Sequence, residues 1–141
     1  MYVFGIVMML GQDGQKYFTL KHKKGLITYG WNARCRNTNY LGEIMLYASF
    51  NVIAQATIVW QIYVGIWSTI FMQRMICKEY ALSKKEGWEE YKQKTWFLLP
   101  KMFGSSMLSC LFYAILTVNS YIIYELGGIE VSIKLLKLHF L

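Results

Sequence analysis

Tyr40 and Glu43 are the two side chains of this sequence whose types and position best suit chemistry, because both stand at the start of a long apolar run. A carboxylate at the mouth of an apolar helix is costly unless it is paired, which makes Glu43 a candidate functional group. A phenol such as Tyr40 can donate a proton or orient a carbonyl. The alternative is structural, since a carboxylate near a helix start is favoured by the helix dipole. The residues alone leave both interpretations open.

The cysteines and histidines do not form a recognisable ligand set. Cys35, Cys77 and Cys110 show no paired spacing, and His22 and His139 lie at opposite ends of the chain. Disulfide frameworks and zinc sites need closely spaced or paired ligands. We therefore expect neither a disulfide framework nor a metal site.

The net charge of +7 comes from basic residues that flank apolar runs. Lys and Arg gather in this way in the loops on one side of a membrane. Nucleic-acid-binding proteins also carry excess positive charge, but usually with a recognisable binding motif, and none is present here. We expect no nucleic-acid partner.

Two charge-free apolar runs predict an all-α, polytopic integral membrane protein. Apolar residues make up 55% of the chain, and no Asp, Glu, Lys or Arg occurs between Ile44 and Met72 or between Phe103 and Tyr124. About 18 or more such residues are long enough, as a helix, to cross the hydrocarbon core. The runs are continuous rather than alternating, which indicates helices and not strands.

The first half of the chain predicts a short helix, a loop and a hairpin. Residues 1–11 form the short apolar helix, and residues 12–40 form a polar, basic loop. Residues 41–72 are long for one crossing and short for two. The segments before and after them are both basic, which favours a hairpin with both ends on the same side of the membrane. We expect the turn between Asn51 and Gln61.

Residues 78–101 predict an amphipathic helix at the membrane interface. Ser83 and Glu86 have the spacing of a capping box, which would start this helix. Trp88 and Tyr91 then share one helical face, and Glu90 is spaced to pair with Lys94 on the solvent side.

The chain is expected to divide after residue 101. Residues 1–101 form the first region, and residues 102–141 add a further transmembrane helix with an apolar tail. That helix covers residues 105–124, and the glycines at 127 and 128 would end it. The tail at residues 129–141 would pack on other subunits or lie on the lipid surface.

Three motifs of the first region resemble a known membrane superfamily. Residues 36–43 read Arg-Asn-Thr-Asn-Tyr-Leu-Gly-Glu. This resembles the Arg-His-Pro-Asn-Tyr-x-Gly-Glu signature of steroid 5α-reductases, sterol reductases and isoprenylcysteine carboxyl methyltransferases. Asp-Gly-Gln-Lys at residues 13–16 resembles the Asp-x-Gln-Lys stretch of the reductase branch. Residues 85–100 resemble its closing Tyr/Trp-x-x-Tyr…Thr…Pro segment, so that the resemblance covers about residues 4–101.

The resemblance implies a pocket for NADPH on the loop side, with the hydride aimed at an enone deeper in the membrane. Lys16 and Arg36 have the charge to hold phosphates, and Tyr40 and Glu43 would be catalytic if the chain is active. In methyltransferase relatives the same region binds S-adenosylmethionine. The residues carried over to the cofactor pocket are Asp13, Lys16, Arg36, Asn39, Tyr40, Glu43, Trp88 and Tyr91. The resemblance also implies that Trp88 and Tyr91 pack against residues 39–43.

Departures from the signature favour an accessory role over catalysis. Asn37 replaces the signature histidine and Thr38 the proline, and an amide cannot transfer a proton near neutral pH. Few helices are present to enclose a lipid substrate. We therefore expect a reduced reductase-like subunit of a larger membrane complex, with other membrane subunits and lipids as partners and the mitochondrial inner membrane as location. The alternatives are an NADPH-dependent reductase of a steroid or lipid enone in the endoplasmic reticulum, and a small S-adenosylmethionine-dependent membrane methyltransferase.

Overall fold

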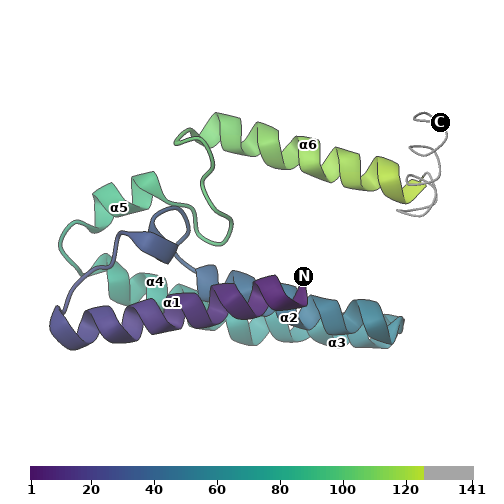
Figure 1. Cartoon of the computed structure of the whole chain (residues 1–141), viewed down its shortest axis with the longest axis horizontal. Helices are drawn as coiled ribbons and strands as arrows, with labels where there is room; N and C mark the ends of the chain where they lie inside the picture. The colour runs from purple at the N-terminus through teal and green to yellow at the C-terminus, as the bar shows by residue number, and fades with distance from the viewer. Residues whose placement is uncertain (126–141) are drawn as a thin grey trace. The chain divides into compact units, whose positions relative to one another are not determined.

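The computed structural model of the chain describes residues 1–125, and Figure 1 shows its helices. This part of the chain is helical and contains no strand, which confirms the all-α prediction for the described residues. Two compact units are present, Met1–Lys101 and Met102–Leu141. The elements are α1 (Tyr2–His22), η1 (Gly30–Asn32), α2 (Thr38–Ala54), α3 (Thr57–Ile66), η2 (Trp67–Phe71), α4 (Met72–Ser83), α5 (Trp88–Lys94) and α6 (Ser106–Glu125).

Within residues 1–125, no helix is both long enough and apolar enough to cross a membrane.

Helix α1 corrects the prediction of a short N-terminal helix. It has 21 residues and ends at His22, so the loop that was predicted to begin at residue 12 begins at residue 23. The extension is stabilised by tertiary contacts, because the buried Gln12 side chain donates to Asn32 Oδ1 at 2.7 Å. Lys21 and His22 in the last turn also complement the helix dipole. These polar contacts cannot be recognised from apolar periodicity, so the prediction ended the helix too early.

Helices α1 and α2 lie side by side in the first unit (Figure 1). In this contact Gly5 of α1 meets Gly42 of α2, and both residues are buried. Small residues at such positions let two helix backbones approach each other closely. This pair positions the start of α2, where the signature motif lies.

Helices α2 and α3 form the predicted hairpin. The break falls at Gln55 and Ala56, inside the predicted window, with Gln55 in the left-handed conformation at φ 50°. The Tyr63 hydroxyl donates to the Ile44 carbonyl at 3.0 Å, which shows that α3 returns along α2. The π-helical segment η2 then continues directly into α4, which brings the basic segment back to the start of α2.

The prediction of one amphipathic helix starting at Ser83 is wrong. Ser83 is the last residue of α4, and its hydroxyl donates backwards to the Tyr80 carbonyl at 2.9 Å rather than capping a new helix. The next helix, α5, begins at Trp88 after Gly87, whose φ of 77° turns the chain. A positive φ is strained in most residues but not in glycine. The predicted shared face is confirmed, because Trp88 and Tyr91 are both buried.

Helix α6 of the second unit confirms the helix predicted at residues 105–124. Near its start, the Ser109 hydroxyl donates to the carbonyls of Ser105 and Met102 at 2.6 and 2.5 Å. The predicted stop at residues 127–128 and the predicted tail at 129–141 lie outside the described residues.

Candidate functional site

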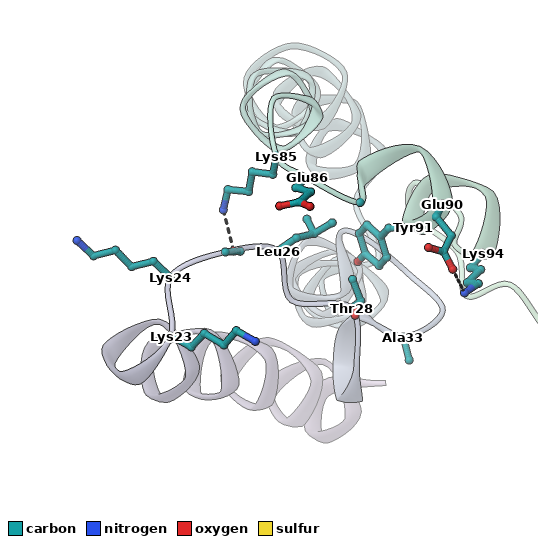
Figure 2. A pocket seen from close by; sticks show the side chains of 12 residues that line it. Lys23, Lys24, Leu26, Thr28, Ala33, Lys85, Glu86, Glu90, Tyr91 and Lys94 are labelled. Carbon is teal, nitrogen blue, oxygen red and sulfur yellow. Dashed lines mark hydrogen bonds and ion pairs between the residues drawn. The ribbon is translucent and has the colours of Figure 1, made fainter.

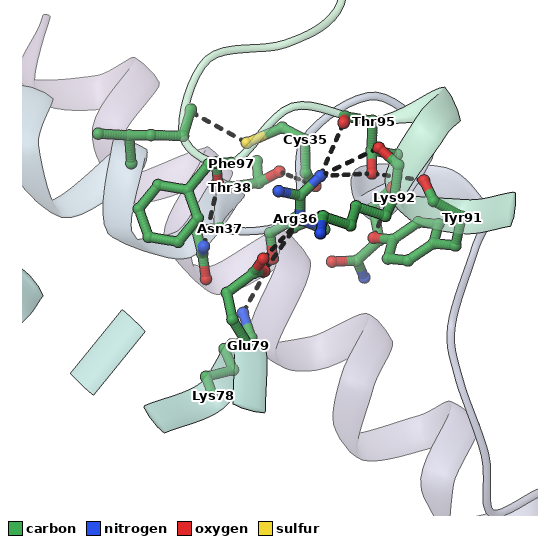
Figure 3. Close-up of polar contacts among 12 residues, drawn as sticks. Cys35, Arg36, Asn37, Thr38, Lys78, Glu79, Tyr91, Lys92, Thr95 and Phe97 are labelled. Carbon is green, nitrogen blue, oxygen red and sulfur yellow. Dashed lines mark hydrogen bonds and ion pairs between the residues drawn. The ribbon is translucent and has the colours of Figure 1, made fainter. Parts of the chain in front are cut away.

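Arg36 is the centre of the polar cluster shown in Figure 3. Its Nε donates to both carboxylate oxygens of Glu79 at 2.9 and 3.0 Å. Its Nη1 donates to the carbonyl and hydroxyl oxygens of Thr95 at 2.7 and 3.1 Å. The guanidinium also lies 5.6 Å from the centre of the Trp88 ring. Arg36 is only 7% exposed, so this side chain joins the residues before α2 to α4 and to the segment after α5.

Backbone pairing reinforces the same junction. The Arg36 amide donates to the Trp96 carbonyl at 3.0 Å, and the Trp96 amide donates to the Arg34 carbonyl at 3.2 Å. The buried Cys35 thiol donates to the Leu98 carbonyl at 3.0 Å. Burial raises the pKa of this thiol above its usual value, which keeps it protonated and unreactive.

Asn37 is enclosed completely, with 0% of its surface exposed. Its Nδ2 donates to the Phe97 carbonyl at 3.0 Å, and its Oδ1 is buried without a hydrogen-bond partner. The residue in the position of the signature histidine therefore fixes the segment after α5. An amide in this environment has no proton to transfer.

Lys78 was not among the predicted site residues, yet it connects two of them. Its ammonium donates to the Arg36 carbonyl at 2.9 Å and lies 5.6 Å from the centre of the Tyr40 ring. Burial, together with the nearby charge of Lys16, lowers the pKa of Lys78 to about 8. Nothing in the sequence distinguishes Lys78 from the other lysines of its basic segment.

Part of the predicted cofactor set lies around one small cavity of about 70 Å³. Lys16, Arg36 and Tyr91 come from the predicted set, and Trp88 adjoins them through Arg36. The cavity is completed by residues that the sequence did not single out, among them Gln12, Asn32, Lys78 and Lys85. It therefore has four basic side chains in its wall.

The other predicted residues lie apart from this cavity, around the start of α2. The charges of Asp13 and Arg74 act on both Tyr40 and Glu43, which places these four side chains in one neighbourhood. The Asn39 backbone amide donates to the Gln12 side-chain carbonyl. Lys78, which contacts Tyr40 and also lines the cavity, connects the two groups.

The resemblance implied that Trp88 and Tyr91 pack against residues 39–43. The hydrogen bond of Tyr91 and the cation–π contact of Trp88 are with Asn32 and Arg36, which come just before that segment. The Tyr91 hydroxyl donates to the Asn32 carbonyl at 2.9 Å, and Trp88 stacks near Arg36. Burial raises the pKa of Tyr91 well above its usual value, so its hydroxyl remains a donor. The two aromatic rings anchor α5 on the loop that leads into α2.

Comparisons of the chain with models of protein families, with curated proteins and with solved structures find no match. The resemblance to reductases therefore depends on the motifs at residues 13–16, 36–43 and 85–100. Within residues 1–125, no group of three His, Cys, Asp or Glu side chains is arranged to hold a metal ion.

Proposed function

We propose that the chain is a reduced steroid-reductase-like membrane protein that acts as a structural or accessory subunit of a larger membrane complex. One observation carries this proposal. Arg36, the signature residue best suited to a phosphate, and Asn37, which stands in place of the signature histidine, use their side chains to hold the chain together at Glu79, Thr95 and Phe97. These hydrogen bonds stabilise the fold and do not require a ligand.

Exposed apolar side chains support a membrane setting and neighbouring subunits. The charge-free hairpin exposes many large apolar side chains, and large exposed apolar surfaces are rare in soluble monomers. Lipids and other subunits would cover it, and a membrane complex such as those of the mitochondrial inner membrane provides both. The exposed residues are Tyr47, Phe50, Val52, Ile53, Ile58, Trp60, Ile62, Val64, Ile66 and Ile70.

The size of the cavity argues against a bound dinucleotide in this conformation. Sites for small molecules and cofactors typically have about 300–1,000 Å³, whereas the cavity beside Arg36 has about 70 Å³. NADPH enclosed beside Arg36 would therefore require this cavity to widen.

A second candidate function is supported by the charges around that cavity. Lys16, Arg36, Lys78 and Lys85 line it together, and phosphates are bound by such groups. An NADPH-dependent reductase in the endoplasmic reticulum, completed by a partner chain, would use them after the cavity opens. This candidate predicts saturable binding of NADPH by the purified chain, which the accessory role does not need.

The state of the chain in its native membrane tests the subunit proposal. The chain is tagged, extracted in mild detergent and separated on a native gel. We expect it to resist alkaline extraction, to migrate with a stoichiometric complex and to be degraded when that complex is depleted. A monodisperse monomer that melts cooperatively by itself would contradict the subunit proposal.

A pair of variants tests the apolar hairpin directly. Ile58→Lys places a charge on the exposed hairpin, where Ile58 is 60% exposed, and we expect it to release the chain from the complex. Tyr29→Lys is the matched control, since Tyr29 is 57% exposed but lies in the loop after α1. Equal behaviour of the two variants would count against the hairpin as the assembly surface.

A further inference from the structure

A large open groove adjoins the small cavity and shares Gly25, Leu26, Lys85 and Tyr91 with it. It has about 730 Å³ (Figure 2). One side is formed by Lys23, Lys24, Gly25, Leu26, Thr28 and Ala33, and the other by Lys85, Glu86, Gly87, Glu90, Tyr91 and Lys94. The Lys85 ammonium donates to the Gly25 carbonyl at 2.9 Å and so holds the two sides at a fixed spacing. Leu26 and Tyr91 line the groove between them. The groove is thus formed before any ligand binds.

Its two sides carry unpaired charges of opposite sign. Lys23 and Lys24 lie on the side formed by the end of α1, and Glu86 lies on the side between α4 and α5 (Figure 2). Within residues 1–125, none of these three charged groups has an ion-pair or hydrogen-bond partner. Glu90 and Lys94, by contrast, pair with each other. The groove therefore offers the free ammonium groups of Lys23 and Lys24 and the free carboxylate of Glu86, while the Lys85 ammonium is bonded to the Gly25 carbonyl.

This arrangement of charge selects the ligand chemistry. A purely anionic ligand, such as a nucleotide, a nucleic acid or an acidic lipid, would match the lysines but would meet the carboxylate of Glu86 with like charge, which is costly. A stretch of polypeptide that carries one acidic and one basic side chain matches both sides. Opposite charges arranged in this way fix the register of two protein surfaces and speed their association.

We propose that this groove binds a segment of a neighbouring protein subunit, with an acidic side chain against Lys23 and Lys24 and a basic side chain against Glu86. The proposal rests on the proposed subunit function and adds the chemistry of the partner. Leu26 and the Tyr91 ring would contact the apolar part of the bound segment. The Lys85–Gly25 hydrogen bond would lower the cost of binding, because the groove requires no rearrangement.

Zero-length cross-linking with a carbodiimide in native membranes tests the proposal. The reagent joins a carboxylate to a neighbouring amine as an amide, and the carbodiimide takes up the water that is lost. Mass spectrometry of the digested complex should find Lys23 or Lys24 joined to an Asp or Glu of another chain. It should also find Glu86 joined to a Lys of the same partner segment. The Glu90–Lys94 ion pair lies in the groove and serves as the internal control, since it should cross-link within the chain.

Matched variants show whether the groove supports assembly. The double variant Lys23→Glu, Lys24→Glu and the single variant Glu86→Lys should each weaken association with the complex about tenfold, equivalent to about 1.4 kcal/mol. Lys21→Glu and Glu89→Lys make the same types of change at exposed positions that do not line the groove, and both should assemble normally. Equal effects of groove and control variants would overturn the proposal.

Two other results would also overturn it. One is a Glu90–Lys94 cross-link without any link from Lys23, Lys24 or Glu86 to another chain. The other is coupling of Glu86 to the amine of a lipid or small molecule, which would show that the occupant is not a protein. A native gel of the same membranes separates the two proposals. A chain that migrates alone refutes the subunit function itself, whereas a chain that migrates in a complex without these cross-links refutes only the groove.

Discussion

Gly5 of α1 and Gly42 of α2 face each other with their backbones in direct contact. A Cβ atom built on Gly5 would lie 2.6 Å from the carbonyl oxygen of Gly42, and one built on Gly42 would lie 2.6 Å from that of Gly5. Real Cβ atoms do not approach backbone oxygens so closely, and backbone cannot move aside as a flexible side chain can. Gly42 belongs to the signature motif, and in this chain close packing against Gly5 requires a residue without a side chain at this position.

We therefore expect Gly42→Ala to destabilise the first unit. Forcing extra atoms into a close-packed contact costs about 1–3 kcal/mol. The measurement is the denaturant concentration at which the chain unfolds within its purified complex. Gly65→Ala is the control, because no atom lies within 4 Å of its added Cβ and alanine is the better helix former. A Gly42→Ala variant as stable as Gly65→Ala would contradict the contact.

The Arg36–Glu79 pair should contribute strongly to stability. Arg36 and Glu79 are 7% and 18% exposed, and removing one partner of a buried pair leaves the other charge without compensation. Glu79→Gln is expected to cost about 3–5 kcal/mol, the range found for broken buried pairs. Glu90→Gln breaks the exposed pair with Lys94 and should have no measurable effect, since exposed pairs contribute little. Equal stability of the two variants would show that Arg36 finds another partner.

The lowered pKa of Lys78 predicts that the folded chain becomes more stable as the pH rises. Its pKa falls from 10.5 in the unfolded chain to about 8 in the folded chain. Between these values the unfolded chain keeps a proton that the folded chain has lost, so unfolding becomes less favourable as the pH rises from about 8 to 10.5. Each unit of pKa difference corresponds to about 1.4 kcal/mol, which is an upper bound for a lysine that keeps some solvent contact.

The variant Lys78→Met removes this contribution, whereas Cys35 and Tyr91 are present in both proteins. Unfolding free energies of the two proteins, measured from pH 7.5 to 10, should diverge in favour of the wild type as the pH rises. Parallel curves over this range would show that Lys78 is not desolvated.

Local patterns in the sequence predicted which elements the first unit contains better than they predicted where those elements begin and end. The charge-free run between two basic segments was enough to predict the hairpin, and helical spacing was enough to place Trp88 and Tyr91 on one buried face. The end of α1 was missed because its second half is held by a polar contact of Gln12 that no periodicity reports. The start of α5 was predicted wrongly because the spacing of Ser83 and Glu86 indicated a side-chain cap at Ser83. The helix instead begins at Trp88, directly after Gly87.

The composition of the site could be predicted only in part. The signature motif marked Arg36 as important, but its partners Glu79 and Thr95 are 43 and 59 residues away, and no local pattern links residues so distant. Lys78 resembles its neighbouring lysines in the sequence and differs only in burial. Whether the predicted residues bind a cofactor stays a prediction.

The last prediction is that the isolated chain does not reduce sterols or enones with NADPH. Proton donation at the signature position is absent, because the Asn37 amide is enclosed and bonded to the Phe97 carbonyl. The Arg36 guanidinium, which the resemblance assigns to a phosphate, is bonded to Glu79 and Thr95. The cavity beside it is several times smaller than typical cofactor sites. Oxidation of NADPH by the purified chain is measured by absorbance with a sterol enone as acceptor, and no rate above the protein-free control is expected. Hydride transfer that disappears in Tyr40→Phe or Glu43→Gln, in variants that unfold at the same denaturant concentration as the wild type, would restore the enzyme interpretation.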